Sequence, residues 1–202
     1  MFKFIVIAFS LVLSSMSFAV TAETQPNPYE VIEQTGQGLF TRIADSQKEL
    51  QKFPDLMRTI VDEELMPHVD YKYASFKILG KHLKKTTAEE RQNFVSSMRQ
   101  YLVRTYANAL GSYKGQTVVY EKAKSTGDKR LVSVTAKIQD ANAPEIEIHF
   151  QMRQNKKTGQ WKAYDMIVEG ISLLQSKKAE LSRKIQQQGV NQVALELASI
   201  AK

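Results

Sequence analysis

The sequence predicts an α+β fold, in which a curved antiparallel sheet of about four strands is wrapped by N-terminal and C-terminal helices. Apolar residues recur at helical spacing as far as residue 110, alternate with polar residues between 117 and 168, and then return to helical spacing. A sheet that is apolar on one face must bury that face, and helices from both ends of the chain can cover it. Cysteine is absent, so packing alone must stabilise the fold.

The first 22 residues have the pattern of a cleaved secretory signal peptide. Lys3 precedes a short apolar run, and small residues then offer cleavage after Ala19 or Ala22. The run is too short for a stable membrane anchor. We therefore expect residues 1–22 to be removed and residues 23–202 to form a single domain. An exported, soluble chain that lacks cysteine fits the bacterial periplasm.

Four helices are expected before the sheet. The second begins at Pro54, a favourable first helical residue, and ends before Pro67. The third stops at Gly80, and the fourth begins with a capping box from Thr87 to Glu90. The expected helical ranges are 25–43, 54–65, 70–80 and 87–110.

Strict alternation of apolar and polar residues predicts the strands. Apolar residues occupy every second position from Val132 to Ile138 and again from Ile146 to Met152. After the sheet, helical spacing runs to the C-terminus with a break at Gly189. The expected strands are 117–124, 130–139, 145–153 and 160–168, with turns at 140–145 and 155–159.

The sequence contains no constellation of residues that predicts catalysis or metal binding. His68, His82 and His149 have no second ligand at metal spacing, and neither a phosphate-binding loop nor a nucleophile elbow occurs. Asp165 and Glu169 would lie roughly 13 Å apart along a strand at ~3.3 Å per residue, whereas the paired carboxylates of glycosidases lie about 5–9.5 Å apart. We therefore expect no enzyme, no cofactor and no metal, and a supporting structural role for both acids.

The chain is mildly basic. Its formal net charge is +7, and it falls to +6 when Lys3 leaves with the signal peptide. Such a surface suits anionic lipids or acidic proteins, whereas nucleic acid is disfavoured because no recognition motif accompanies the charge. The densest positive region is either a solvated helix face or a docking patch for a partner or a lipid head group. The region contains Lys72, Lys77, Lys81, Lys84, Lys85 and Arg91, and all of these except Lys77 are the candidates for docking or head-group contact.

Four stretches resemble one known family, in the same order and with similar spacing. They are similar to the periplasmic phospholipid-shuttle proteins of the MlaC type, also called the toluene-tolerance Ttg2D family. The resemblance covers 27–174 and becomes loose after residue 175. The four stretches are "NPY" (27–29), "RTIVDEELMPHVDYKYASFKILGKH" (58–82), "YLVRTYANALGSYKGQTV" (101–118) and "TGQWKAYDMIVEGISLL" (158–174).

The resemblance implies an NTF2-like cone with a helical subdomain and a non-enzymatic role. It implies a carrier that moves phospholipid through the periplasm between an outer-membrane lipoprotein–porin complex and an inner-membrane ABC transporter, and so maintains the lipid asymmetry of the outer membrane. Phospholipid would be its cargo rather than a cofactor, and a monomer would suffice. The acyl tails would enter a deep apolar cavity between sheet and helices, with the head group near solvent.

We expect the cavity wall where the last strand meets the following helix, with Tyr164, Met166 and Val168 along one side of that strand. Residues of the preceding helices and of neighbouring strands would face it. The full set of expected cavity residues is Phe76, Leu79, Phe94, Met98, Leu102, Tyr106, Val134, Ile148, Phe150, Tyr164, Met166, Val168, Ile171 and Leu174.

Two other functions remain open. An NTF2-like enzyme on an apolar substrate would need a deep polar group with a shifted pKa, for which Asp165 and Tyr164 are candidates. A non-lipid periplasmic adaptor would use its apolar residues only as a core and act through the basic patch. A cavity too small for two acyl chains would favour the adaptor, and a turnover product would favour the enzyme.

Overall fold

The computed structural model describes residues 26–201, so the expected signal peptide lies outside the described residues. Helices precede and follow the sheet, as the sequence predicts. The helical elements are α1 (Pro28–Asp45), α2 (Gln47–Lys52), α3 (Leu56–Ile60), the π-helical turn η1 (Val61–Leu65), the 3₁₀ turns η2 (Met66–His68) and η3 (Gly80–Lys85), α4 (Tyr71–Leu79), α5 (Ala88–Leu110) and α6 (Leu173–Ile200).

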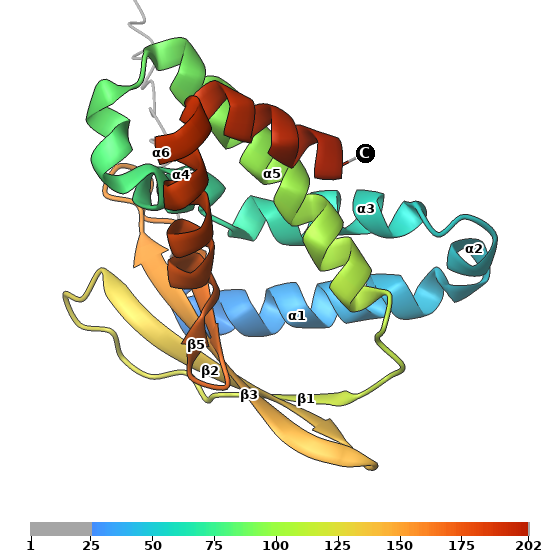
Figure 1. Cartoon of the computed structure of the whole chain (residues 1–202). Helices are drawn as coiled ribbons and strands as arrows, with labels where there is room; N and C mark the ends of the chain where they lie inside the picture. The colour runs from blue at the N-terminus through green and yellow to red at the C-terminus, as the bar shows by residue number, and fades with distance from the viewer. Residues whose placement is uncertain (1–25, 202) are drawn as a thin grey trace, which may run out of the picture.

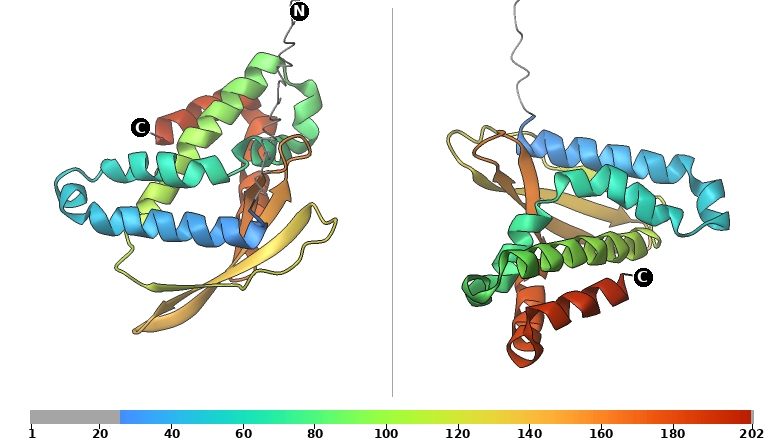
Figure 2. Two further views of the ribbon diagram at one scale, coloured as in Figure 1. Left: turned by 180° about the vertical axis from the view of Figure 1, so that it is seen from behind. Right: turned by 90° about the horizontal axis from the view of Figure 1, so that it is seen from above.

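The sheet has five antiparallel strands in the order β1-β2-β3-β4-β5, one more than expected. The added strand is only two residues long. In Figure 1, α1, α3 and α5 lie over one face of the sheet and α6 rises from its β5 edge, and the view from above in Figure 2 agrees. The predicted α+β class is therefore confirmed. The strands are β1 (Thr117–Tyr120), β2 (Leu131–Asp140), β3 (Ala143–Gln154), β4 (Trp161–Val168) and β5 (Ile171–Ser172).

Local side-chain chemistry explains where the two long N-terminal helices begin. The Asn27 side chain accepts hydrogen bonds from the N–H groups of Tyr29 and Glu30, and the Glu30 carboxylate accepts from the Asn27 N–H. Thr87 and Glu90 form the same reciprocal pair at the start of α5, which confirms the predicted capping box. Each box satisfies amides that have no partner inside the helix.

Two boundaries in the sheet differ from the sequence prediction for clear reasons. β1 ends at Tyr120 because the Glu121 carboxylate accepts the Thr135 N–H at 2.8 Å, in place of a backbone carbonyl. The expected turn at 140–145 is a tight hairpin that pairs Asp140 with Ala143, and Pro144 lies where the register shifts. A bulge tolerates proline because no ladder hydrogen bond is required there.

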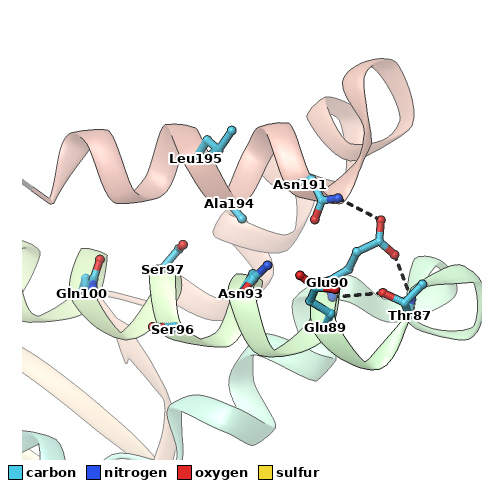
Figure 3. Close-up of a pocket in the computed structure, with 10 residues that line it drawn as sticks. All are labelled: Thr87, Glu89, Glu90, Asn93, Ser96, Ser97, Gln100, Asn191, Ala194 and Leu195. Atoms are coloured by element: carbon cyan, nitrogen blue, oxygen red, sulfur yellow. Dashed lines mark hydrogen bonds between the residues drawn. The ribbon is translucent and has the colours of Figure 1, made fainter.

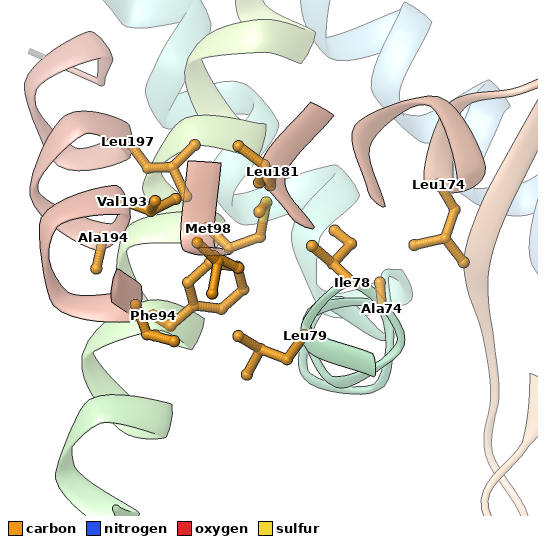
Figure 4. Close-up of a cluster of buried hydrophobic side chains, with 12 residues drawn as sticks. Ala74, Ile78, Leu79, Phe94, Met98, Leu174, Leu181, Val193, Ala194 and Leu197 are labelled. Carbon is orange, nitrogen blue, oxygen red and sulfur yellow. The ribbon is translucent and has the colours of Figure 1, made fainter. Parts of the chain in front are cut away.

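Three buried clusters hold the elements together. The first, which we call the helical cluster, joins α4, α5 and both halves of α6 around Phe94 and Met98 (Figure 4). The second joins α1, α3, η1 and α5 around Ile60 and Val61. The third packs the start of α1 onto the sheet, where Ile32 belongs to the same cluster as Val134 and Met152.

A bend in α6 at Gly189 creates the helical cluster. Gly189 has φ 83° and ψ 165°, values outside the helical region that glycine adopts without a steric penalty. The sequence predicted this break. After it the chain folds back along α5 (Figure 1), so that Leu181 from the first half and Val193 from the second half enter one core.

Two glycines of α1 provide a matched stability test. A Cβ on Gly36 would come within 2.8 Å of the Tyr120 Cζ atom, whereas a Cβ on Gly38 would meet only Glu64 Oε2, at 3.9 Å. We expect Gly38→Ala to raise the free energy of unfolding by about 1 kcal/mol, the usual gain of alanine over glycine in a helix. Gly36→Ala should instead lower it by about 1–2 kcal/mol, since overpacking outweighs that gain. Urea unfolding measures both, and equal effects would contradict a close contact between α1 and β1.

Candidate functional site

The strand register places apolar residues in rows on the face of the sheet that α1 covers. Val134 pairs with Phe150, and Phe150 pairs with Met166. Ile148 likewise pairs with Val168. Residues that face each other in antiparallel strands point to the same side, so these rows form one continuous inner face. The alternation in the sequence predicted the rows within β2 and β3.

A β-bulge removes Tyr164 from this face, which corrects the prediction that Tyr164, Met166 and Val168 share one side. Met152 pairs with Ala163, but Phe150 pairs with Met166, so β4 carries one extra residue between them. Ala163 therefore takes the place in the row that Tyr164 was expected to occupy. The Tyr164 ring instead lies edge-on to Tyr73 of α4, 5.3 Å between centroids.

Several of the expected cavity residues from the helices belong to the helical cluster. Leu79, Phe94 and Met98 are at most 1% exposed there, and Leu174 is 7% exposed. Phe76 and Tyr164 pack against the same cluster. These side chains hold α4, α5 and α6 together. Helical spacing correctly marked them as buried, but the partner that buries them is α6.

The remaining apolar residues of the inner face define what we call the uncovered face. None of them joins the three clusters: Met166, Ile148, Val168 and Ile138 are half-buried, and Ile146 is 40% exposed. Next to them, Ile171 pairs with Val168 and is 60% exposed. Among the residues that the structure describes, the uncovered face is therefore a set of apolar side chains that belong to none of the three buried clusters, although Ala136, which pairs with Ile148 in the same row, is 3% exposed.

Two side chains of α5 border the same interior. Leu102 packs against the helical cluster and against the second cluster, which joins α1, α3, η1 and α5. Tyr106 packs against the second cluster. Burial, followed by the charges of Asp165 and Tyr101, raises the pKa of Tyr106 to about 12. Tyr106 is nevertheless only half-buried by surface area.

The two acids of the last strand have structural partners. Asp165 accepts hydrogen bonds from the Ser172 hydroxyl at 2.6 Å and the Leu174 N–H at 2.9 Å, and so fixes the start of α6 against β4. Glu169 accepts from the Glu147 N–H at 3.0 Å. Glu169 (φ 48°) and Gly170 (φ 78°) form the two-residue turn into β5. Both carboxylates therefore support the junction of sheet and helix.

A polar hollow lies elsewhere on the described surface. A groove of about 660 Å³ runs between α5 and the second half of α6 (Figure 3). Glu90 spans its end, accepting from Asn191 Nδ2 at 3.2 Å. Serine, asparagine and glutamate side chains line most of it. Hydrocarbon placed there would desolvate polar groups without replacing their hydrogen bonds, so the groove does not suit acyl chains.

The basic residues singled out in the sequence are spread over three elements. Lys72 lies in the first turn of α4, and the lysines of η3 lie close together, since Lys81 and Lys85 both lower the pKa of His82 after a larger effect of burial. Arg91 has a structural role, because its guanidinium donates to the Thr86 carbonyl at 2.6 Å.

The three histidines lie on separate elements. His149 lies on the outer face of the sheet, where it pairs with Thr135, whereas His68 belongs to η2 and His82 to η3.

No group of three or more metal-binding side chains occurs within residues 26–201. Over the same range, no helix is both long enough and apolar enough to cross a membrane.

The comparison with protein families decides the relationship of this chain. The model of the MlaC protein family matches residues 33–199, nearly all of the described chain. The chain belongs to the MlaC family. The expected resemblance, drawn from four short stretches, is thus confirmed over most of the sequence, and the match includes α6, where the resemblance was loose.

Two curated proteins are similar to this chain in sequence, and one solved structure shares its fold. The chain is 34% identical over 168 residues to the intermembrane phospholipid transport system binding protein MlaC of Haemophilus influenzae, covering 82% of this chain and 78% of that protein. It is 25% identical over 158 residues to the toluene tolerance protein ttg2D of Pseudomonas putida, covering 78% and 72%. The phospholipid-binding protein of Ralstonia solanacearum, solved in complex with a phospholipid, has the same fold with a TM-score of 0.76 at 20% identity, covering 87% and 97%.

The Tyr106 phenol provides a pH test of the interior. Its folded pKa of about 12 exceeds the ordinary value of about 10, so the folded protein favours the neutral phenol. The stability that this preference contributes is complete below pH 10 and is lost as the pH rises towards 12. We expect urea unfolding of the wild type between pH 9 and about 11.5 to lose more stability than that of Tyr106→Phe. If the stability of the wild type and of Tyr106→Phe fell equally over this pH range, the Tyr106 phenol would be exposed to water.

Proposed function

We propose that this MlaC protein carries phospholipid through the periplasm, with the acyl tails on the uncovered face and beneath Leu102 and Tyr106. The observation that supports this proposal is the set of half-buried apolar residues on the inner face that belong to none of the buried clusters. A protein core is normally filled to crystalline density, so an apolar surface left open in the interior requires an occupant. Ile171 lies at the rim of this space and Val134 and Phe150 at its closed end, beside α1.

The energetics suit a carrier. Transfer from water is worth about 0.8 kcal/mol per CH₂, so two long acyl chains gain on the order of 20 kcal/mol before entropic losses. A lipid does not cross water alone at a useful rate against such a barrier. The carrier supplies an apolar surface and needs no catalytic group.

The family relationship also supports the wider setting of this role. The relatives named for intermembrane phospholipid transport and for phospholipid binding imply a donor and an acceptor membrane system. We infer an inner-membrane ABC transporter complex of the Mla type and an outer-membrane lipoprotein–porin complex as partners, and maintenance of outer-membrane lipid asymmetry as the result. The lysines of η3, which make no ion pair in the described chain, form the candidate docking patch.

Native mass spectrometry of the protein purified from the periplasm tests the proposed function directly. We expect a bound mass equal to that of a phospholipid, which is lost on denaturation and recovered by solvent extraction of the same sample. A protein mass without ligand, unchanged after incubation with phospholipid vesicles, would contradict the carrier role.

Met166→Glu tests the location of the tails. A carboxylate on the uncovered face would be desolvated by hydrocarbon at a high cost in free energy, so we expect retained phospholipid to fall by at least about tenfold. The matched control is Val119→Glu, which places the same group on the outer face of β1, where Val119 is 44% exposed and pairs with Lys137. Thermal unfolding should show both variants folded. Full lipid retention in Met166→Glu would place the tails elsewhere.

A further inference from the structure

A second, smaller hollow of about 220 Å³ lies where α4 begins beside the edge of the sheet. The chain entering α4 follows β4, because Val69 forms a parallel bridge with Ala163 and the Asp70 N–H donates to the Ala163 carbonyl at 2.8 Å. The other walls come from the end of β3, the start of β4 and the turn between them. Three separate segments therefore meet at this point.

Each of these segments contributes a cation to the pocket: Lys72 from α4, Arg153 from β3 and Lys162 from β4. The lining contains one carboxylate, Asp70, which already has its partners. Asp70 pairs with Arg153 at 2.6 Å and accepts the Tyr73 N–H at 3.1 Å. The lining therefore carries two more positive than negative charges.

Neither lysine has an ion-pair partner among residues 26–201. Lys162 lies close enough to His68 for its charge to lower the pKa of that imidazole, after a larger effect of burial. His68 is therefore neutral at pH 7. Two unpaired ammonium groups that face one hollow repel each other, and an anion between them removes that repulsion.

The remaining polar groups of the pocket are arranged as donors. The Arg153 guanidinium is fixed over the Tyr73 ring, 4.4 Å from its centroid, and only one of its nitrogens pairs with Asp70. The side-chain oxygen of Asn155 accepts hydrogen bonds from the N–H groups of Lys157 and Thr158, so its side-chain NH₂ group takes no part in these two bonds of the turn. A guanidinium held by stacking keeps several N–H donors in a fixed plane, which matches an oxyanion.

The size of the pocket restricts the ligand. A volume of about 220 Å³ is below the range of about 300–1,000 Å³ typical of sites that enclose whole small molecules. It suits a single charged group with several oxygens. A phosphate can reach two ammonium groups and a guanidinium together, because its oxygens are arranged around one centre.

We propose that the pocket of Lys72, Arg153 and Lys162 binds a phosphate group, which belongs to a phospholipid head group or to a free phosphate or phosphomonoester. The phosphate site stands on the cations and donors of the pocket alone. Only its assignment to a head group rests on the proposed function. The Tyr73–Tyr164 pair connects this pocket to the helical cluster.

The first experiment titrates the lipid-free protein with inorganic phosphate and follows backbone amide signals by NMR, with sodium chloride at equal ionic strength as the reference. We expect saturable shifts at 69–72 and 160–162 with phosphate only. Lys72→Ala/Lys162→Ala should bind at least about tenfold more weakly, since each charge-assisted contact is worth roughly that factor. The control Lys48→Ala/Lys52→Ala removes the same charge from α2 and should bind like the wild type.

Shifts that are equal with chloride, or equal in the pocket variant and the wild type, would overturn the phosphate site. The second experiment compares retained phospholipid in the two double variants. A loss confined to Lys72→Ala/Lys162→Ala identifies the phosphate as the lipid head group, and unchanged retention identifies a free phosphate or phosphomonoester. Phosphate binding by a wild type that never retains lipid would contradict the proposed carrier role and leave the phosphate site intact.

Discussion

The packing of α6 against α5 is the interaction on which the rest of the structure depends. Because α6 bends at Gly189, both of its halves close around Phe94 and Met98, and this side of α5 is fully occupied. This side of α5 therefore packs against α4 and α6. Of the three buried clusters, the third joins α1 to the inner face of the sheet, at the end that contains Val134 and Met152. The uncovered face results from this arrangement, in which α5 packs against α4 and α6 while α1 packs on one end of the sheet.

The walls around that surface are fixed by polar contacts and not only by packing. Asp165 ties the first turn of α6 to β4, and the chain before α4 bonds to the opposite end of the same strand through Ala163. β4 is thus held by two helices along its outer edge and by β3 along the other. A wall built in this way can stay in place when its apolar side is empty, because hydrogen bonds of good geometry replace the missing van der Waals contacts.

Much of this arrangement could be predicted from the sequence, and the failures have identifiable causes. Alternation gave the rows of β2 and β3, and a capping box and a glycine located the start of α5 and the bend in α6. The bulge at Tyr164 was missed, because a single inserted residue changes the side without changing the composition of the strand. The stripe of α5 marked Phe94 and Met98 as buried, but periodicity cannot tell which element covers a helix. The cationic pocket was found only in part, since Lys162 and Arg153 lie about 80–90 positions from Lys72 and meet it only through the pairing of Val69 with Ala163.

The bend at Gly189 also has a consequence for the order in which the molecule can be completed. Val193 and Leu197 lie in the second half of α6, yet they share a cluster with side chains of α5 about one hundred positions earlier. The β2–β3 hairpin closes through near neighbours and can form as soon as it has been synthesised, whereas the helical cluster has to wait for the final turns of α6. During synthesis α5 therefore exposes its apolar stripe until the second half of α6 has been made. α6 completes the helical cluster, which can form only when both halves of this helix are available.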